Sequence, residues 1–131
     1  MHAFCTYCSA QKSKDPGDIP AIHRYQSHRI ARVYRAAQEL RQAFFILSGE
    51  YGLLSPDHPI PWYDHLLKLE EVALLANRIA EQIAHLRIDG FTFFTQSLER
   101  DPSVAPYCQA LLKACEQVSV PLSIVEVNLD D

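Results

Sequence analysis

The run Ala43-Phe44-Phe45-Ile46-Leu47 and the segment after it, SGEYGLLSPDHPIPWYD from Ser48 to Asp64, decide the fold of this chain. Residues 43–47 are apolar without alternation, which is typical of a central parallel strand buried on both faces. Residues 48–64 combine a small-residue turn with prolines, aromatic residues and acidic groups. Binding sites are commonly built where a buried strand leads into such mixed residues. We therefore expect residues 48–64 to form the main part of a site.

The length and composition are those of one ordinary globular domain. The chain has 131 residues, of which 48% are hydrophobic and 21% charged, so residues 1–131 are expected to form a single domain with its own core. No apolar run approaches the roughly 20 residues of a membrane-spanning helix. The first residues also lack the basic-then-apolar pattern of a signal peptide. We expect a cytoplasmic protein with no membrane partner.

Charge is spread unevenly along the chain, although the net charge is only -4. Residues 1–42 carry seven Lys or Arg against three Asp or Glu, and residues 43–131 carry five against thirteen. The overall balance argues against an electrostatically driven nucleic-acid binder. The basic part is explained either by a solvated helix face or by a site for an anion.

Apolar runs alternate with helical patterns along the chain. This alternation predicts right-handed crossovers and a mostly parallel sheet. The expected fold is a single three-layer α/β domain with a four-stranded sheet and helices on both faces. Residues 9–20 and 48–64 are expected to be long loops, and residues 128–131 an acidic tail. Strands are expected at residues 2–8, 43–47, 91–95 and 122–127, and helices at residues 28–40, 66–86 and 107–118.

The first helix carries both a cap signal and a basic face. Ser27 is a suitable N-cap, because apolar residues follow it at helical spacing from Ile30 to Leu40. Arg29 and Arg32 lie between the apolar positions. They are explained either as part of a solvated face or as two cations that flank an anion at the first turn.

The four cysteines are expected to be packed or free thiols. Cys5 and Cys8 have the spacing of a zinc or redox pair, but residues of this spacing point to opposite faces of a strand. Cys108 and Cys115 lie seven residues apart on a predicted helix, with no second close pair. We therefore expect no metal site and no cofactor, and regard a structural zinc as the weaker alternative.

The predicted topology brings several polar segments to one rim. Ligands of open α/β sheets bind beyond the carboxyl ends of the strands. Residues Cys8 to Lys12 follow the first predicted strand, and Ser48 to Tyr51 follow the second. Residues 25–28, which open the first helix, belong to the same rim. We expect these groups to lie together.

Four segments occur in this order: Cys8-Ser9-Ala10-Gln11-Lys12, Pro20-Ala21-x-x-x-Tyr25-x-Ser27, Ile46-Leu47-Ser48-x-x-Tyr51-Gly52-Leu53-Leu54-x-Pro56 and Ile60-x-x-Tyr63-Asp64. Together they resemble a bacterial family of unknown function. The segment from Ser48 also resembles peroxide-stress proteins of the YaaA type. The Cys-x-x-x-Lys and Tyr-Ser segments are similar to a domain of archaeal archaeosine synthases, which act on a 7-deazaguanine base in transfer RNA. The resemblance spans residues 8–64 and implies chemistry on a nucleobase or nucleoside.

Three residues are the candidates for catalysis, and each also has a structural explanation. Cys8 is either a small core residue or a thiolate nucleophile activated by Lys12. Besides activating Cys8, Lys12 could hold a phosphate or carboxylate. Its structural explanation is a solvated loop cation. Asp64 either caps the next helix or serves as a general base.

The remaining candidates are expected to bind the ligand. Ser48 and Gly49 form a tight turn or present N–H groups to an oxyanion. Tyr51 and Tyr63 anchor the loop or stack on a planar base. Trp62 forms the floor of a pocket or packs inside. The predicted ligand-binding residues are Tyr25, Ser27, Arg29, Ser48, Gly49, Glu50, Tyr51, Trp62 and Tyr63.

The sequence therefore predicts a site for a nucleobase, nucleotide or simple anion at the strand ends, with a reaction on a nucleobase or nucleoside. The alternative is a non-catalytic module that binds nucleic acid or a protein. The chain has four glycines and no glycine-rich phosphate loop, and it has no serine-hydrolase elbow.

Overall fold

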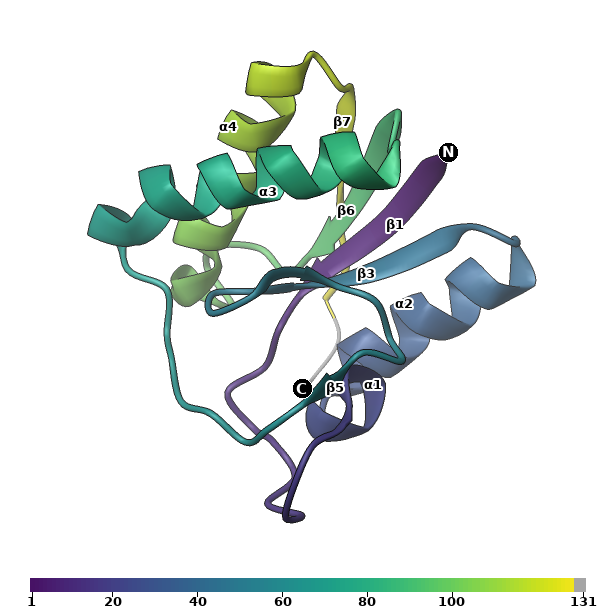
Figure 1. Ribbon diagram of the computed structural model, residues 1–131, viewed down its shortest axis with the longest axis vertical. Helices are drawn as coiled ribbons and strands as arrows, with labels where there is room; N and C mark the ends of the chain where they lie inside the picture. Colours follow the sequence, from purple (N-terminus) through teal and green to yellow (C-terminus); the bar gives the residue numbers. More distant parts are fainter. Residues whose placement is uncertain (129–131) are drawn as a thin grey trace.

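A computed structural model describes residues 1–128 and shows a mixed five-stranded sheet with helices packed against it (Figure 1). Neighbouring strands are parallel except for one antiparallel pair. The α/β class and the mostly parallel sheet are confirmed. Of the expected acidic tail, residues 129–131 lie outside the described part of the chain. In spatial order the strands are β4 (Gly52–Leu54), β3 (Ala43–Ser48), β1 (His2–Tyr7), β6 (Gly90–Thr95) and β7 (Leu122–Glu126).

The sheet has five strands because the chain turns back along β3 within the segment that was predicted as a loop. Leu47 pairs with Leu53, and Ser48 pairs with Gly52, in an antiparallel register. Gly52 has a φ of 74°, a conformation that costs glycine nothing and other residues about 1–2 kcal/mol. A strand of only three residues is too short to show a sequence period, so β4 was not predicted.

Four α-helices and two short 3-10 helices complete the described chain. Helix α2 packs against β1 and β3, whereas α3 packs against α4 and β4. Among the described residues no helix has the length and apolar character needed to cross a membrane. A small second sheet pairs β2 (Ile19–Pro20) with β5 (Pro59–Ile60). The helices are α1 (Ala21–Arg24), α2 (His28–Glu39), α3 (Val72–Leu86), α4 (Ala105–Val118), η1 (Leu69–Glu71) and η2 (Pro102–Val104).

The start of the first predicted helix agrees with the structure, whereas the start of the second does not. Ser27 caps α2, because its Oγ accepts a hydrogen bond of 3.1 Å from the Ile30 N–H, as predicted. The helix predicted from residue 66 begins only at Val72, after η1. The prediction that Asp64 caps this helix is therefore wrong. Residues 61–68 instead run as an extended strap below the strand ends (Figure 1).

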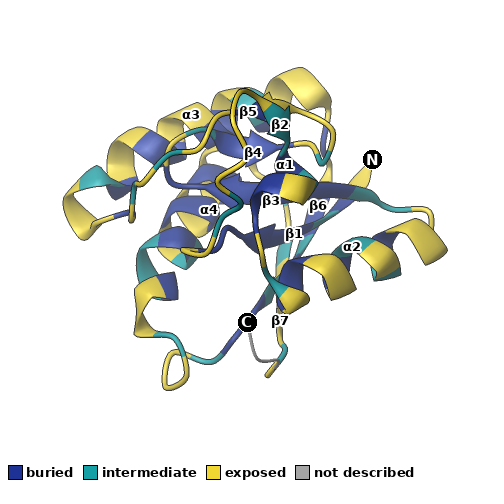
Figure 2. Cartoon of the chain, turned by 90° about the horizontal axis from the view of Figure 1, so that it is seen from below, coloured by how far each residue is buried: buried dark blue, intermediate teal, exposed yellow. Residues whose placement is uncertain are grey.

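The core lies between the sheet and the inner faces of the helices. Residues on the central strands β1, β3 and β6 are mostly buried, and the outer faces of α2 and α3 are exposed (Figure 2). Ile46, Leu47 and Phe93 are fully buried, which explains why the predicted strands lack polar alternation.

A buried arginine organises the long loop between β1 and α1. Arg24 is fully buried, and its guanidinium donates hydrogen bonds of 2.7–3.3 Å to the carbonyls of Ser13, Asp15, Gly17 and Ile60. Buried charged groups are tolerated where their hydrogen bonds are satisfied. Arg24 thereby fixes the path of residues 13–17 and ties them to β5.

The outward backbone groups of β4 are covered by one side chain of α3. Gln82 Oε1 accepts from the Leu53 N–H at 2.8 Å, and its Nε2 donates to the Tyr51 and Leu53 carbonyls at 3.1 and 3.4 Å. A Cβ atom on Gly52 would lie 2.4 Å from Gln82 Oε1. Gly52 is therefore needed both for its backbone conformation and for this close approach.

Two glycine variants separate these two effects. Gly17 has nearly the same φ, 75°, but a Cβ there would meet nothing within 4 Å. We expect Gly17→Ala to lower the free energy of unfolding by about 1–2 kcal/mol. Gly52→Ala should cost a further ~1–3 kcal/mol, because Gln82 is displaced and leaves the Leu53 backbone groups unpaired. Urea denaturation measures both, and equal losses would show that the Gln82 contact contributes nothing.

Candidate functional site

A pocket of about 280 Å³ lies at the carboxyl end of β1, and we call it the Cys8 pocket. Its wall is formed by residues 7–12, by Gln26 and Arg29 at the start of α2, and by residues 64–66 of the strap. Asp101, Ser103 and Tyr107 contribute from η2 and α4. The predicted rim therefore exists, and of the predicted site residues it brings together Cys8, Lys12, Arg29 and Asp64.

Backbone hydrogen bonds hold the Cys8–Lys12 segment in place. The Cys8 N–H donates to the Leu47 carbonyl at 2.9 Å, which continues the β1–β3 pairing by one residue. Gln11 accepts from the Gln26 N–H at 3.0 Å, and Lys12 forms an antiparallel bridge with Tyr25. The segment that carries the thiol and the ammonium group is thus fixed on both sides.

Arg29 braces the end of β1 beneath the pocket. It is fully buried, and NH1 donates to Thr6 Oγ1 at 2.6 Å and to the Tyr7 carbonyl at 2.7 Å, while NH2 reaches the Cys8 carbonyl at 3.3 Å. Its guanidinium carbon also lies 3.6 Å from the centre of the Tyr7 ring. These contacts give Arg29 a structural role, and its predicted pairing with Arg32 around an anion stays a prediction.

Asp101 links β1 to the segment that begins α4. Its Oδ2 accepts from the Tyr7 hydroxyl at 3.0 Å, and its Oδ1 accepts from the Ser103 N–H and hydroxyl at 3.2 and 2.5 Å. Asp101 thereby caps η2 and fixes one wall of the Cys8 pocket.

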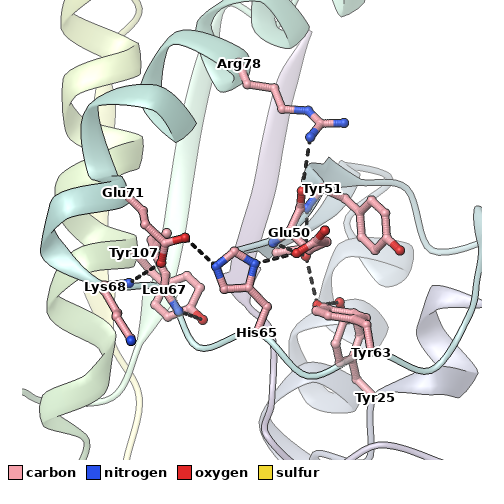
Figure 3. Close-up of polar contacts among 11 residues, drawn as sticks. Tyr25, Glu50, Tyr51, Tyr63, His65, Leu67, Lys68, Glu71, Arg78 and Tyr107 are labelled. Carbon is pink, nitrogen blue, oxygen red and sulfur yellow. Dashed lines mark hydrogen bonds and ion pairs between the residues drawn. The ribbon is translucent and has the colours of Figure 1, made fainter.

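A directed chain of hydroxyl groups lies next to the pocket (Figure 3). Ser48 Oγ accepts from the N–H groups of Glu50 and Tyr51, both at 3.1 Å, which uses its two lone pairs. Its own proton must then be donated to the Tyr63 hydroxyl, 2.8 Å away. Tyr63 in turn donates to the hydroxyl of Tyr25. The fixed direction leaves the Tyr25 proton as the last donor of the chain.

Three tyrosines that interact with Cys8 have raised pKa values. Burial raises the pKa values of Tyr25, Tyr63 and Tyr107, and a negative charge on Cys8 is the next cause in each case. Their hydroxyls therefore stay protonated at neutral pH and act as neutral donors. Tyr107 also accepts from the Leu67 N–H at 3.1 Å, and a hydrogen bond with Cys8 contributes to its raised pKa. Cys8 itself is only 8% exposed but lines the pocket.

Lys12 joins the pocket to the tyrosine pair. Its Nζ lies 4.6 Å from the centre of the Tyr63 ring and 5.9 Å from that of Tyr25. Contacts of this kind hold an ammonium group over an aromatic face without neutralising its charge. Lys12 is thus positioned by Tyr63 and lines the pocket as a cation.

His65 is held between two carboxylates (Figure 3). Its Nδ1 lies 2.5 Å from Glu50 Oε2, and its Nε2 lies 2.7 Å from Glu71 Oε2. A neutral imidazole has one N–H group and can donate to only one of them, so the arrangement favours the imidazolium. The hydrogen bond with Glu50 is the main cause that raises the pKa of His65. This Glu50–His65–Glu71 clamp ties the strap to the β3–β4 turn and to the start of α3.

The other three cysteines, Cys5, Cys108 and Cys115, do not line the Cys8 pocket. Burial raises the pKa of Cys5 strongly and that of Cys115 to about 11, so both stay thiols. All four cysteines are free. Within residues 1–128, no group of three or more His, Cys, Asp or Glu side chains is arranged to hold a metal ion.

The other predicted ligand-binding residues are divided among neighbouring features. Gly49 and Glu50 line a separate hollow beside α3, and Tyr51 lines one between β4 and α3. Ser27 serves as the cap of α2. Trp62 is 49% exposed and lines a hollow outside the Cys8 pocket, so the interpretation of a buried packing role is wrong.

Part of the pocket wall was not predicted from the sequence. Tyr107 and Asp101 follow β6 on the same rim, but they lie seven or more residues beyond Phe94, outside any recognised motif. Asp101 before Pro102 is a cap signal that could have been found. His65 was hidden because residues 66–71 were assigned to a helix.

Removing one hydroxyl tests the directed chain. We expect Tyr63→Phe to lower the free energy of unfolding by ~1–3 kcal/mol, because the Ser48 proton loses its acceptor and Tyr25 loses its donor. Tyr34→Phe is the matched control. Tyr34 is a half-buried tyrosine of α2, and its ring packs on Phe44 of β3. Equal losses in the two variants, measured by denaturant titration, would contradict the role of the chain.

The His65 clamp predicts a pH-dependent stability. Because folding raises the pKa of His65, proton binding stabilises the folded state. This contribution is fully present below the unfolded pKa of about 6.5 and is lost as pH rises through the folded pKa. The melting temperature of the wild type should therefore exceed that of His65→Gln by more at about pH 6 than at about pH 9. Exposed His23, changed to Gln, is the control, and a pH-independent gap would refute the clamp.

Comparison with protein families gives one result. Residues 6–127 match a family described as "Family of unknown function (DUF6884)". No curated protein and no solved structure matches the chain. The predicted membership of a family of unknown function is confirmed, whereas the resemblances to YaaA-type proteins and to archaeosine synthases stay predictions. The match covers nearly the whole chain, and the protein therefore belongs to the family of unknown function DUF6884.

Proposed function

We propose that the Cys8 pocket binds a molecule of nucleobase or nucleoside size and presents Cys8 and Asp64 to it as reactive groups. The observation that carries this proposal is the convergence of a thiol, an ammonium group, two carboxylates and a tyrosine hydroxyl in one small pocket at the strand ends. Polar groups that converge in a concave site at this edge of an α/β sheet are the usual mark of a ligand site.

The size and chemistry of the pocket support a small planar ligand. Its volume of about 280 Å³ lies near the lower end of the range for small-molecule sites, roughly 300–1,000 Å³. The edge of a nucleobase alternates donors and acceptors. Gln11 and Gln26 supply both kinds of group, Asp64 and Asp101 accept, and Lys12 donates.

The chemistry of the wall favours this pocket over a larger hollow of about 690 Å³ between β4 and α3. Of the residues predicted from the sequence, only Tyr51 lines that hollow. The larger hollow also lies against the edge strand β4, whereas the Cys8 pocket lies at the carboxyl end of the central strand β1.

Two further inferences belong to this proposal. We infer three layers, with α2 on one face of the sheet and α3 and α4 on the other, which leaves the strand ends uncovered by helices. The contacts of α2 with β1 and β3, and of α3 with α4 and β4, support this. We also infer a reducing compartment such as the cytoplasm, because all four cysteines are free.

Thermal shift measurements test the proposal. The wild-type protein is heated with a panel of nucleobases, nucleosides, nucleotides and inorganic phosphate. A ligand that binds the folded state raises the melting temperature in proportion to the logarithm of its concentration. We expect a shift with at least one base or nucleoside, reduced in Lys12→Ala and in Cys8→Ser.

The matched control is Lys113→Ala, which removes the same charge from an exposed position of α4. It should keep the full shift. No shift with any member of the panel, or equal shifts in Lys12→Ala and Lys113→Ala, would refute binding at the Cys8 pocket.

A further inference from the structure

We propose that the hollow outside the Cys8 pocket binds the backbone and a neighbouring base of a single-stranded nucleic acid, whose target base enters the pocket. The proposal rests on the proposed function and extends it from a free base or nucleoside to a base within a strand. The hollow, which we call the outer hollow, has a volume of about 560 Å³. It is lined by Ala10, Gln11, Lys12, Lys14, Gln26 and Trp62.

The outer hollow and the Cys8 pocket are adjacent parts of one surface. Ala10, Gln11, Lys12 and Gln26 line both of them. A ligand that fills the Cys8 pocket and continues outward past Lys12 would therefore enter the outer hollow. A free base has no such continuation, whereas a nucleotide in a strand has a phosphate on each side.

Trp62 gives the outer hollow a surface for stacking. It is the only tryptophan of the chain, and 49% of it is exposed even though its neighbour Tyr63 is half-buried. Exposed aromatic side chains beside basic groups are what non-specific single-strand binders use, because every base has a face on which to stack. Trp62 lines the outer hollow but not the Cys8 pocket, so it is available to the base next to the target.

Lys12 and Lys14 supply positive charge on a fixed backbone. The Ser13 N–H donates to the Arg24 carbonyl at 2.7 Å, and the Arg24 guanidinium donates to the carbonyls of Ser13 and Asp15 at 2.8 and 2.9 Å. Lys14 is therefore held from both sides while its side chain is exposed. Two lysines on such a support can meet successive phosphates with little loss of backbone entropy.

The buried arginine below adds to the local positive charge. Arg24 donates only to neutral carbonyls in its five hydrogen bonds, so these contacts leave its full charge beneath the lysines. The net charge of -4 is the sum of -8 from residues 43–131 and +4 from residues 1–42, which supply every lining residue of the outer hollow except Trp62. A short strand, rather than a long duplex, fits a basic area of this small size.

Tryptophan fluorescence provides a direct test, because Trp62 is the only tryptophan of the chain. The wild type is titrated with mixed-sequence single-stranded octanucleotides, as DNA and as RNA, and separately with mononucleotides. We expect the octanucleotides to quench the fluorescence and to bind at least tenfold more tightly than the mononucleotides. The slope of log affinity against log salt should be about -1.4, that of two phosphate contacts.

Fluorescence anisotropy of a labelled octanucleotide extends the test to the variants. Trp62→Ala should weaken binding about tenfold through loss of one stacked base. Lys14→Ala should reduce the salt slope by about 0.7, and Lys113→Ala should leave affinity and slope unchanged. Each variant must first show the melting temperature of the wild type within the error of the measurement.

The outcomes separate the two proposals. If a base or nucleoside raises the melting temperature but octanucleotides bind no more tightly than mononucleotides, the outer hollow has no such role and the Cys8 pocket stands. The same conclusion follows if Trp62→Ala and Lys14→Ala bind the octanucleotide as well as the wild type. If neither nucleosides nor octanucleotides bind, both proposals are refuted.

Discussion

The buried hydroxyl of Ser48 stands at the end of β3, where it accepts two backbone N–H groups and donates to Tyr63. One small side chain thus shapes the turn into β4 and attaches the strap that carries Asp64 and His65. Because both of its lone pairs are occupied, it also fixes the direction of every proton in the chain to Tyr25. The β3–β4 turn and the position of the strap beside the site both depend on Ser48 Oγ, so a change at Ser48 would affect both.

The buried cations show how a charge in the sequence can mislead. Arg24 and Arg29 account for part of the basic character of residues 1–42, yet both are fully buried and bind mainly backbone carbonyls. Arg29 holds the end of β1, and Arg24 ties residues 13–17 of the following loop to β5. The cations that reach solvent at the rim are Lys12 and Lys14, which are fewer but placed on a backbone that the arginines keep rigid.

Elements marked by an apolar run or by a local cap signal could be predicted from the sequence, and segments placed by contacts between distant residues could not. Strands 43–48 and 90–95 and the cap at Ser27 follow from apolar runs and local hydrogen bonding. Residues 66–71, which are the end of the strap and η1, were predicted as helix because Leu66, Leu67 and Leu69 continue the apolar pattern of α3, although Leu66 and Leu69 are exposed. The rim was predicted from topology, whereas Tyr107 reaches it only through the packing of α4, which no local signal records.

The two edge strands of the sheet differ, because the side chain of Gln82 covers β4. It occupies the backbone groups of Leu53 that a further strand would need, so the sheet cannot grow beyond β4 by edge-to-edge pairing. At the opposite border, residues 123–126 of β7 are exposed, with Ile124 and Val125 among them. Any extended segment that joins this sheet, from another molecule or another protein, would therefore add at β7, on the border away from the β3–β4 turn.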